Sequence, residues 1–287
     1  MNNHRQQKFN TKHKPTWCPG CGDYSIWHAL KATVADLGWE PHQFCVVYDI
    51  GCSGNMCSMI NAYGFHGLHG RSLPVAAGIK MSNHELPLII VGGDGGLYGE
   101  GMGHFVHFTR ANHDVTMIVH DNQVYGLTTG QTSPTTERGI KTKTNPHGGF
   151  EFPVNPVSLA ITAGATFVAR GFAGNTDHTA MLMKKAIEHK GFSIIDIFQP
   201  CVTFNQHNTY DWFKERVYYL EDTDYQPNDK VVAYQKSLEF EKLPLGVLYE
   251  TTAEKSYEEC LEQIQSGALI HSKNTERDIM PLYKEFM

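Results

Sequence analysis

Residues 87–122 read PLIIVGGDGGLYGEGMGHFVHFTRANHDVTMIVHDN and contain the pattern that decides the fold. The apolar runs at 87–93 and 115–121 have the length and composition of buried strands, and a helix is expected between them at about 103–111. Continuous apolar strands joined through a helix indicate neighbouring parallel strands, because a parallel pair needs a crossover connection. The residues that follow the two strands are therefore expected at one edge of the sheet.

The same alternation continues on both sides of this stretch. Further strands are expected at 44–50, 166–170 and 192–198, and further helices at 24–37 and 178–189. Asp23 is expected to cap the first of these helices, and Gly38 is expected to end it. Apolar strands separated by helices predict an α/β fold with a parallel sheet that is covered on both faces.

Three regions are expected along the chain. Residues 1–14 are polar and predict a solvated N-terminal arm, whereas residues 15–207 contain the strand–helix alternation of one domain. From 208 to 287 the alternation weakens. This last region is predicted to be a C-terminal extension that faces another subunit, rather than a further layer of the sheet.

Composition narrows the possible classes of function. The chain has 287 residues, 41% of them hydrophobic, and a formal net charge of −6. It has no basic block typical of a nucleic-acid-binding protein, and no apolar run of the roughly 18 residues that span a membrane. The polar N-terminus has no secretory signal, so a cytoplasmic location is expected. In that compartment the seven cysteines are better suited to metal or redox chemistry than to disulfides.

The segment GGDGG (92–96) and Asn122 together predict a site for magnesium and a diphosphate. Glycines let backbone amides approach phosphate oxygens closely, and the helix that follows adds a favourable dipole. Asp94 and Asn122 follow neighbouring strands, and carboxylate, amide and main-chain carbonyl oxygens are suitable ligands for Mg²⁺. A Walker P-loop is excluded because the GK[ST] ending is absent, and the glycines are out of register for a dinucleotide fingerprint.

Four cysteines occupy positions suited to metal binding. Cys18 and Cys21 flank a Pro-Gly knuckle, whereas Cys52 and Cys201 each follow a predicted strand. Because strand ends meet at one sheet edge, the four thiolates are expected to converge there. Such a set binds either Zn²⁺ or a cubane iron–sulfur cluster, and the spacing alone leaves both open.

Five other cysteines and histidines have less specific positions. Cys45 lies inside a predicted strand and is expected in the core, while Cys57 and Cys260 are assigned no role. His104 and His107 lie about one turn apart on the helix expected at 103–111, where packing is favoured over metal binding.

Long motifs in the chain resemble a known family. WCPGCGDYSI, IGCSG, YGFHGLHGR, GDGG, HFVHFTRAN, DNQVYGLTTGQTSPTT and NPVSLA are similar to the β subunits of the 2-oxoacid:ferredoxin oxidoreductases, nearly continuously over about 16–220. The resemblance implies a thiamine diphosphate-binding α/β fold. It also implies conversion of a 2-oxo acid and coenzyme A to acyl-CoA, CO₂ and reduced ferredoxin, in a heterodimer with an α subunit or in a dimer of such heterodimers.

The resemblance also implies the roles of individual residues. Mg²⁺ would be bound by Asp94, Asn122 and the Val124 carbonyl, and a [4Fe–4S] cluster by Cys18, Cys21, Cys52 and Cys201. The candidates for the substrate pocket are His69, Arg71, Leu127, Thr128 and Thr129. The residues expected to bind the cofactor are Gly51, Cys52, Ser53, His69, Gly93, Asp94, Gly95, Gly96, Asn122, Val124, Gly126, Leu127 and Thr128.

The sequence departs from the family pattern at three places. Gly96 stands where many members have an acid, GCSGN stands where many have GCSSR, and Thr129 stands where many have lysine. The first two affect local contacts, and the third bears on recognition of the substrate's charge. The loop around Thr129 and the segment RVYYLEDTDYQPNDK favour 2-oxoglutarate over pyruvate as the substrate.

Two other classes of function compete with the redox subunit. A non-redox thiamine diphosphate decarboxylase would use Asp94 and Asn122 without a cluster, and a binding module would use the cysteines for structural zinc. The redox subunit is also expected to depend on its α subunit. The carboxylate that activates thiamine lies on a second α/β domain in enzymes of this kind, and the residues after 207 are too few for one.

Overall fold

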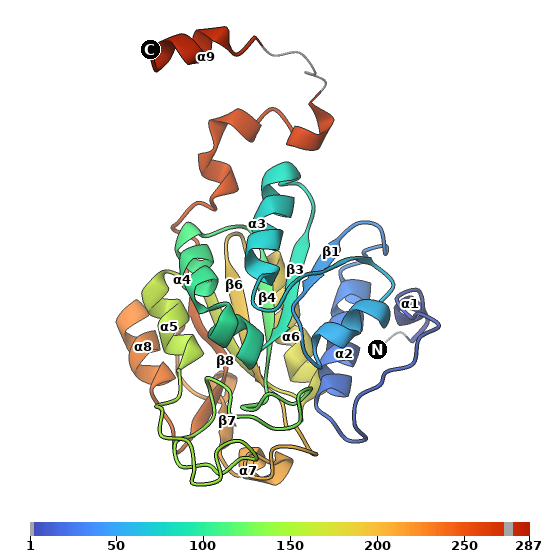
Figure 1. Cartoon of the computed structure of the whole chain (residues 1–287), viewed down its shortest axis with the longest axis vertical. Helices are drawn as coiled ribbons and strands as arrows, with labels where there is room; N and C mark the ends of the chain where they lie inside the picture. Colours follow the sequence, from blue (N-terminus) through green and yellow to red (C-terminus); the bar gives the residue numbers. More distant parts are fainter. Residues whose placement is uncertain (1–2, 273–277) are drawn as a thin grey trace.

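The computed structural model describes residues 3–272 and 278–287 and has an eight-stranded sheet at its centre (Figure 1). The strand order is β2-β1-β3-β4-β6-β5-β8-β7, and the first six of these are parallel to one another. The strands are β1 (Cys45–Tyr48), β2 (Tyr63–His66), β3 (Leu88–Gly93), β4 (Thr116–Asp121), β5 (Phe167–Phe172), β6 (Ser193–Phe198), β7 (Val217–Tyr219) and β8 (Leu243–Glu250).

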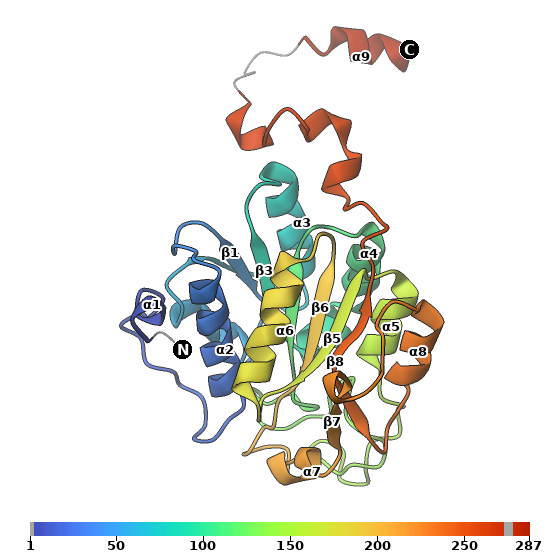
Figure 2. The same ribbon diagram turned by 180° about the vertical axis from the view of Figure 1, so that it is seen from behind.

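Helices cover both faces of the sheet. Helices α2 and α6 pack together on one face, and α3, α4, α5 and α8 lie on the other (Figures 1 and 2). Each face has its own buried core, because successive side chains of the strands point to opposite sides. The helices are α1 (Asn3–Gln7), α2 (Asp23–Asp36), α3 (Ser72–Ser82), α4 (Met102–Ala111), α5 (Pro156–Ala163), α6 (Thr176–Glu188), α7 (Tyr210–Lys214), α8 (Lys230–Ser237) and α9 (Met280–Glu285).

The predicted α/β fold with a mostly parallel sheet is confirmed. The strands expected at 44–50, 87–93, 115–121, 166–170 and 192–198 correspond to β1, β3, β4, β5 and β6. The three expected helices correspond to α2, α4 and α6. Gly38 has a φ of 75° shortly after α2, which is the left-handed conformation expected of a residue that ends a helix.

The expected capping role of Asp23 is wrong. Asp23 is the first residue of α2, and the residue before it, Gly22, provides no side-chain cap. The Asp23 carboxylate is buried and lies 2.6 Å from Nδ1 of His120 on β4. A buried carboxylate needs a strong partner, and His120 provides it in place of the helix amides.

The N-terminal arm lies on the body of the protein, so the expectation that it is solvated throughout is wrong. Phe9 is fully buried, and its ring lies 6.0 Å from that of Phe44. The Thr11 hydroxyl donates a 2.7 Å hydrogen bond to the Ser58 carbonyl. One aromatic side chain among polar neighbours is enough to fix the arm, because burying it removes a large apolar area from water.

The sheet continues past residue 207. Strand β8 pairs antiparallel with β5, and β7 pairs parallel with β8 at the edge of the sheet. Beyond β8 the chain leaves the amino-terminal edge of the sheet through short turns and reaches α9 (Figure 1). A domain boundary near 207 and a subunit-facing role for the extension stay predictions.

No helix within residues 3–272 and 278–287 combines the length and the apolar character needed to cross a membrane.

Candidate active site

The ends of four neighbouring strands bring the predicted site residues to the carboxyl edge of the sheet. In spatial order the strands are β1, β3, β4 and β6, and they lead to Cys52, Asp94, Asn122 and Cys201 respectively. A cavity of about 190 Å³ lies at this edge. A ligand site outside the carboxyl ends of parallel strands is the usual arrangement for folds of this class.

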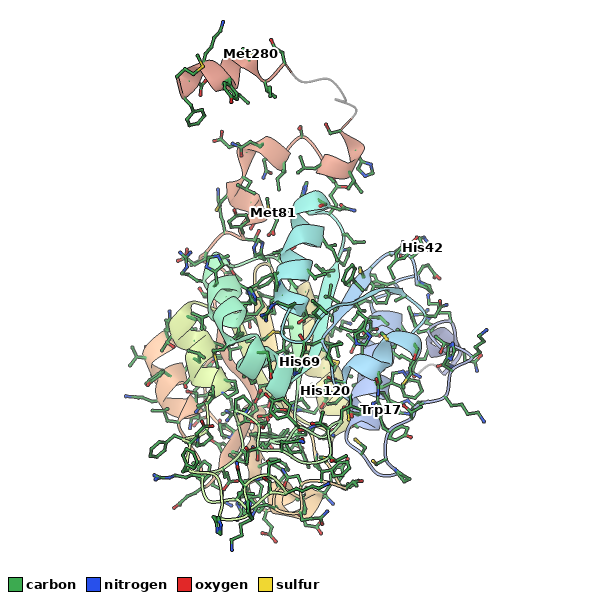
Figure 3. The ribbon with its side chains drawn as sticks, viewed as in Figure 1. Trp17, His42, His69, Met81, His120 and Met280 are labelled. Atoms are coloured by element: carbon green, nitrogen blue, oxygen red, sulfur yellow. The ribbon has the colours of Figure 1, made fainter. Side chains whose placement is uncertain are left out.

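All thirteen residues expected to bind the cofactor line this one cavity. They come from the segment after β1, the loop after β2, the turn after β3 and the loop after β4. The lining residues are Ile50, Gly51, Cys52, Ser53, His69, Gly93, Asp94, Gly95, Gly96, His120, Asn122, Val124, Tyr125, Gly126, Leu127 and Thr128. Figure 3 shows His69 and His120 in this region, and Met280 on the distant C-terminal segment.

A larger cavity lies at the opposite, amino-terminal edge of the sheet. Its volume is about 370 Å³, and Lys80, Asp114 and His189 are among its lining residues. None of the predicted site residues lines it. Size alone does not identify a functional cavity, so the smaller cavity with its convergent polar groups is the better candidate.

The Asp94 carboxylate is held by hydroxyl groups. Asp94 is buried at the end of β3, and its carboxylate accepts hydrogen bonds from Ser133 and, at 2.7 Å, from Thr135. Burial raises the pKa of this carboxyl, whereas the two hydroxyl donors oppose that shift. Thr135 also lies 2.8 Å from the carboxylate of Asp121 and therefore links the two acids.

The loop after β4 turns sharply around Gln123. Gln123 has a φ of 58°, and the Val124 amide donates a 3.0 Å hydrogen bond to the side-chain oxygen of Asn122. Asn205 donates to the Asn122 carbonyl at 3.0 Å and ties this loop to the one after β6. The turn places Asn122 and Val124 beside Asp94 on the cavity wall. Their oxygen atoms are of the kind that Mg²⁺ prefers.

Two buried polar atoms on the cavity wall have no partner among the described residues. They are the Ser53 hydroxyl oxygen and Nε2 of His120. His120 is 1% exposed, and its other ring nitrogen faces Asp23. Leaving a buried polar atom unpaired is costly, so these atoms favour a polar ligand in the cavity.

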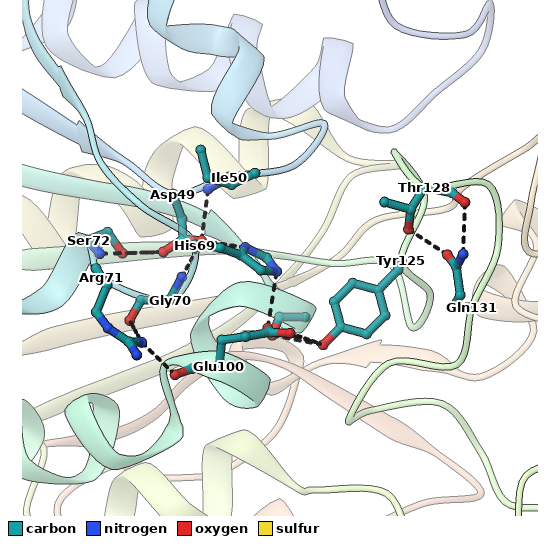
Figure 4. A network of polar contacts seen from close by, with 11 residues as sticks. Asp49, Ile50, His69, Gly70, Arg71, Ser72, Glu100, Tyr125, Thr128 and Gln131 are labelled. Atoms are coloured by element: carbon teal, nitrogen blue, oxygen red, sulfur yellow. Dashed lines mark hydrogen bonds and ion pairs between the residues drawn. The ribbon is translucent and has the colours of Figure 1, made fainter.

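Asp49 holds the loop that carries His69. The Asp49 carboxylate is fully buried and accepts hydrogen bonds from the Gly70 amide at 3.0 Å and the Ser72 hydroxyl at 2.8 Å (Figure 4). Nδ1 of His69 lies 3.2 Å from the same carboxylate. On the other side of the ring, Nε2 lies 3.1 Å from the carboxylate of Glu100. The imidazole is therefore fixed between two acids at the cavity wall.

Two departures from the family pattern meet at Asp49. A Cβ atom at Gly96 would collide with a carboxylate oxygen of Asp49, and one at Gly54 would collide with its carbonyl oxygen. Neither position has room for a side chain. An acid is therefore present beside position 96 in this chain, but it comes from Asp49 at the end of β1.

The five candidates for the substrate pocket do not all reach the cavity. His69, Leu127 and Thr128 line it, and Thr128 is held by hydrogen bonds with Gln131 (Figure 4). Arg71 donates instead to the carbonyls of Gly70 at 3.2 Å and Glu100 at 2.9 Å. Thr129 is exposed, has a φ of 79° and is not among the lining residues.

Three segments bring the four predicted cluster cysteines together. Gln199 donates a hydrogen bond at 3.3 Å to the Cys21 sulfur, and Trp17 donates to the Cys52 carbonyl at 2.7 Å. A Cβ atom at Gly126 would lie 3.5 Å from the sulfur of Cys201 and 3.7 Å from that of Cys52. Cys52 therefore belongs both to the cavity wall and to the cysteine group.

Burial disfavours the thiolate form of these cysteines. Burial first, and then the negative charges of Asp23 and Cys201, raises the pKa of the Cys52 thiol to about 12. Burial likewise raises the pKa of Cys21 and of Cys201. Within residues 3–272 and 278–287, no three or more His, Cys, Asp and Glu side chains are arranged to hold a metal ion. The donor type fits iron, whose positive charge would offset the cost of buried thiolates.

The remaining candidates lie outside this group. Cys45 is buried in the core, as predicted, and Cys260 is exposed. Cys57 lies 3.4 Å from Nδ1 of His66. His107 is exposed, so the expectation that it packs is wrong, whereas His104 is partly buried.

Several residues at the site were not found from the sequence. Asp49, Glu100 and His120 belong to no short motif, and their importance depends on contacts between distant segments. Ser133 and Thr135 lie inside the segment QTSPTT. Two hydroxyl residues in a motif so close to a conspicuous acidic turn were the available signal.

Comparison with protein families defines the class of the chain. Residues 49–197 match the family described as "Thiamine pyrophosphate enzyme, C-terminal TPP binding domain". Residues 201–266 match the family of the C-terminal part of the pyruvate ferredoxin oxidoreductase β polypeptide. The first match spans just over half of the chain and includes the whole cavity wall. The chain is therefore a thiamine diphosphate enzyme.

Individual relatives define the family more closely. The chain is 40% identical to subunit beta of 2-oxoacid:ferredoxin oxidoreductase 2 from Aeropyrum pernix, over 94% of this chain and 91% of the relative. It is 38% identical to the 2-oxoglutarate synthase subunit KorB from Archaeoglobus fulgidus, over 72% of this chain and 77% of the relative.

A solved structure gives the same result. The 2-oxoglutarate:ferredoxin oxidoreductase from Magnetococcus marinus, with 2-oxoglutarate, coenzyme A and succinyl-CoA bound, has a TM-score of 0.90 and 33% identity, covering 100% of this chain and 97% of that chain. The chain belongs to the β subunits of the 2-oxoacid:ferredoxin oxidoreductases, as its motifs predicted.

Proposed function

We propose that this β subunit holds magnesium–thiamine diphosphate and a [4Fe–4S] cluster at the carboxyl edge of its sheet. The enzyme would decarboxylate a 2-oxo acid oxidatively, transfer the acyl group to coenzyme A and pass the electrons through the cluster to ferredoxin. The observation that carries this proposal is the position of Cys52. It lines the cavity that gathers the predicted cofactor residues, and its sulfur approaches the same glycine as that of Cys201.

Thiamine diphosphate, when bound, supplies the nucleophilic carbon and the electron sink that decarboxylation requires. The chain's own residues would bind and orient it. The Ser53 hydroxyl and Nε2 of His120 are unpaired on the cavity wall and would each find a partner in the cofactor. His69 would present a ring that two carboxylates hold in place.

Magnesium would be bound by the Asp94 carboxylate, the Asn122 amide oxygen and the Val124 carbonyl. This assignment is supported by the shared cavity wall and by the hydroxyl groups of Ser133 and Thr135, which orient the carboxylate. Hydrogen bonds of this kind hold a ligand in the orientation that the metal needs.

The cluster would be bound by Cys18, Cys21, Cys52 and Cys201. Thiolate ligands from the knuckle and from two strand ends would place it directly beside the thiamine cavity. Short separation favours the transfer of electrons from thiamine to the cluster. No proton transfer is assigned to a residue of this chain, because the cofactor performs the bond-breaking step.

The substrate preference is proposed to be 2-oxoglutarate, with pyruvate as the alternative. The loop around Thr129 and the segment after 215 favour it, and the names of one relative and one solved structure contain 2-oxoglutarate. The α subunit would contribute the carboxylate that activates thiamine, together with contacts to the substrate and to coenzyme A. A cytoplasmic location stays part of the proposal.

The test is a chemical analysis of the complex of this chain with a co-expressed α subunit, purified without oxygen. We expect brown protein with equal amounts of iron and acid-labile sulfide, and with bound magnesium and thiamine diphosphate. Thiamine diphosphate without iron would instead favour the non-redox decarboxylase. Zinc in a colourless protein would favour the zinc-stabilised binding module and remove the proposed electron path.

A further inference from the structure

The first 22 residues are basic although the chain as a whole is acidic. They contain Arg5, Lys8, Lys12 and Lys14 and neither aspartate nor glutamate, whereas the formal net charge of the chain is −6. The first acidic residue, Asp23, is 1% exposed. The segment therefore presents a positive surface on a protein that is otherwise negative.

This segment leads directly to the cysteine group. In Figures 1 and 2 the chain after α1 runs down the side of the molecule to the carboxyl edge of the sheet. Lys12, His13 and Lys14 are exposed along it, and Trp17 and Cys18 follow. The buried Phe9 fixes the beginning of this path, and the Trp17 hydrogen bond to the Cys52 carbonyl fixes its end.

The positive charges of Lys12 and Lys14 are free to act on a partner. Lys8 is paired with Glu40 at 2.6 Å. Neither Lys12 nor Lys14 forms an ion pair with a carboxylate in the part of the chain that the structure describes. An unpaired exposed lysine contributes to steering rather than to the stability of the fold.

Two exposed loops cover the cysteine group next to these lysines. The knuckle exposes Pro19 and Gly20, and a Cβ atom at Gly20 would lie 3.9 Å from the Val202 side chain. Val202 is 37% exposed and Phe204 is 36% exposed, both in the loop that begins with Cys201. The Gly22 amide donates to the Pro200 carbonyl at 3.2 Å and holds the loops together. The two loops form a small apolar surface directly over the cysteines.

We propose that this face, formed by residues 12–20 and 202–204, is the docking surface for the acidic electron-carrier protein that accepts electrons from the cluster. The proposal rests on the proposed function, because it requires a cluster at the four cysteines. Electron transfer weakens steeply with distance, and the cover over the cysteines is thin here. Such encounters use small contact areas and depend on complementary charge for fast association.

The observations favour an acidic protein over other polyanions. The two free lysines flank a small apolar surface, whereas a nucleic acid would need a longer basic stripe to neutralise many phosphates. A small acidic carrier needs only a few charges for orientation and a short apolar contact for close approach. The acidity of the rest of the chain would also repel such a carrier from other faces.

The experiment uses the αβ complex with its cluster and a recombinant acidic ferredoxin. The test variant carries Lys12→Glu with Lys14→Glu. The matched control carries Lys185→Glu with Lys230→Glu, an equal change in charge on exposed residues of α6 and α8. Binding of oxidised ferredoxin is titrated directly, and turnover is measured with ferredoxin and with methyl viologen, a small cationic acceptor.

We expect the Kd for ferredoxin to rise about tenfold in the test variant at low ionic strength, and the difference to shrink as salt screens the charges. The KM for ferredoxin should rise in parallel, while turnover with methyl viologen matches that of the parent. The control should bind ferredoxin like the parent.

Two results would overturn the docking proposal. One is an equal Kd in the test and control variants. The other is failure of the test variant to assemble with the α subunit on gel filtration, which would show that this face is buried against the α subunit. Absence of methyl viologen turnover in the parent complex would contradict the proposed function itself and is thus distinguishable from both.

Discussion

His120 has one ring nitrogen bonded to Asp23 and the other unpaired on the cavity wall. We expect His120→Ala to weaken thiamine diphosphate binding roughly tenfold or more, since a hydrogen bond to a charged group contributes about 1.5–3 kcal/mol. Equilibrium titration of the cofactor in the presence of magnesium measures the effect. The same substitution at the exposed His42 is the control and should leave the affinity unchanged. Equal affinities in the two variants would show that His120 only supports the core.

Asp94 is the carboxylate proposed to bind magnesium. We expect Asp94→Ala to reduce magnesium-dependent binding of thiamine diphosphate by more than roughly tenfold, because a hard-cation site loses both a charge and a ligand. The measurement is the amount of cofactor that remains after dialysis against a chelator. A full complement of cofactor in the variant would mean that Asp94 is only a turn residue.

The sequence predicted individual residues where chemistry and chain position coincide. Asp94 and Asn122 follow neighbouring strands, so the rule for parallel sheets brings them together without further information. Asp49 and Glu100 hold His69 from two segments whose proximity depends on how the loops fold. No local pattern distinguishes such residues from ordinary surface or core polar residues. The partner of Asp23 was missed for the same reason.

At the scale of secondary-structure elements, the turn after β3 and the end of β1 share one small space around Asp49. We expect Gly96→Asp to destabilise the protein by about 2 kcal/mol or more, since two buried carboxylates would collide and repel. Combined with Asp49→Ala, it should cost less than the sum of the single changes, by about 1 kcal/mol or more.

The measurement for this pair is the free energy of unfolding by denaturant for the four proteins of the cycle. The matched control combines Asp49→Ala with Gly103→Asp, because position 103 has open space and no contact with Asp49. Strictly additive effects for the Asp49 and Gly96 changes would contradict the exchange of one carboxylate for the other.

The cysteines join three chain segments into one proposed cluster site. We expect Cys52→Ser and Cys201→Ser each to lose most of the iron and sulfide while keeping a folded sheet, because serine is a poor ligand for iron in such a cluster. The exposed Cys260→Ser serves as the control and should retain both elements. Iron and sulfide contents in the first two variants equal to those of the control would reject the ligand assignment.

Buried parallel strands were the elements best predicted from the sequence, because continuous apolar runs such as LIIV at 88–91 have few alternative structures. Strand β2 was not predicted, since its residues are all exposed at the sheet edge and carry no alternating pattern. Helix α3 contains Pro74 and Gly78, which weaken a helical signal. Strand β8 was overlooked within a region whose charged and aromatic residues suggested an extension.

At the scale of the whole molecule, the chain is expected to be inactive by itself. The region after 207 adds two strands to the existing sheet rather than building the second α/β domain that would carry the activating carboxylate. We expect the isolated chain, with reconstituted cluster, cofactors, 2-oxo acid and coenzyme A, to show less than about a hundredth of the turnover of the αβ complex. Comparable turnover would show that this chain contains a complete active site.

The central claim is that thiamine diphosphate and a [4Fe–4S] cluster lie side by side in this chain and exchange electrons. The most direct measurement follows the visible absorption of the cluster in the αβ complex when a 2-oxo acid is added without oxygen and without ferredoxin. We predict that the absorption bleaches in the complex with thiamine diphosphate, and that it stays unchanged when the cofactor is omitted or when Asp94 is replaced by alanine. A complex that binds thiamine diphosphate and releases CO₂ but has no absorption that bleaches would contradict the account.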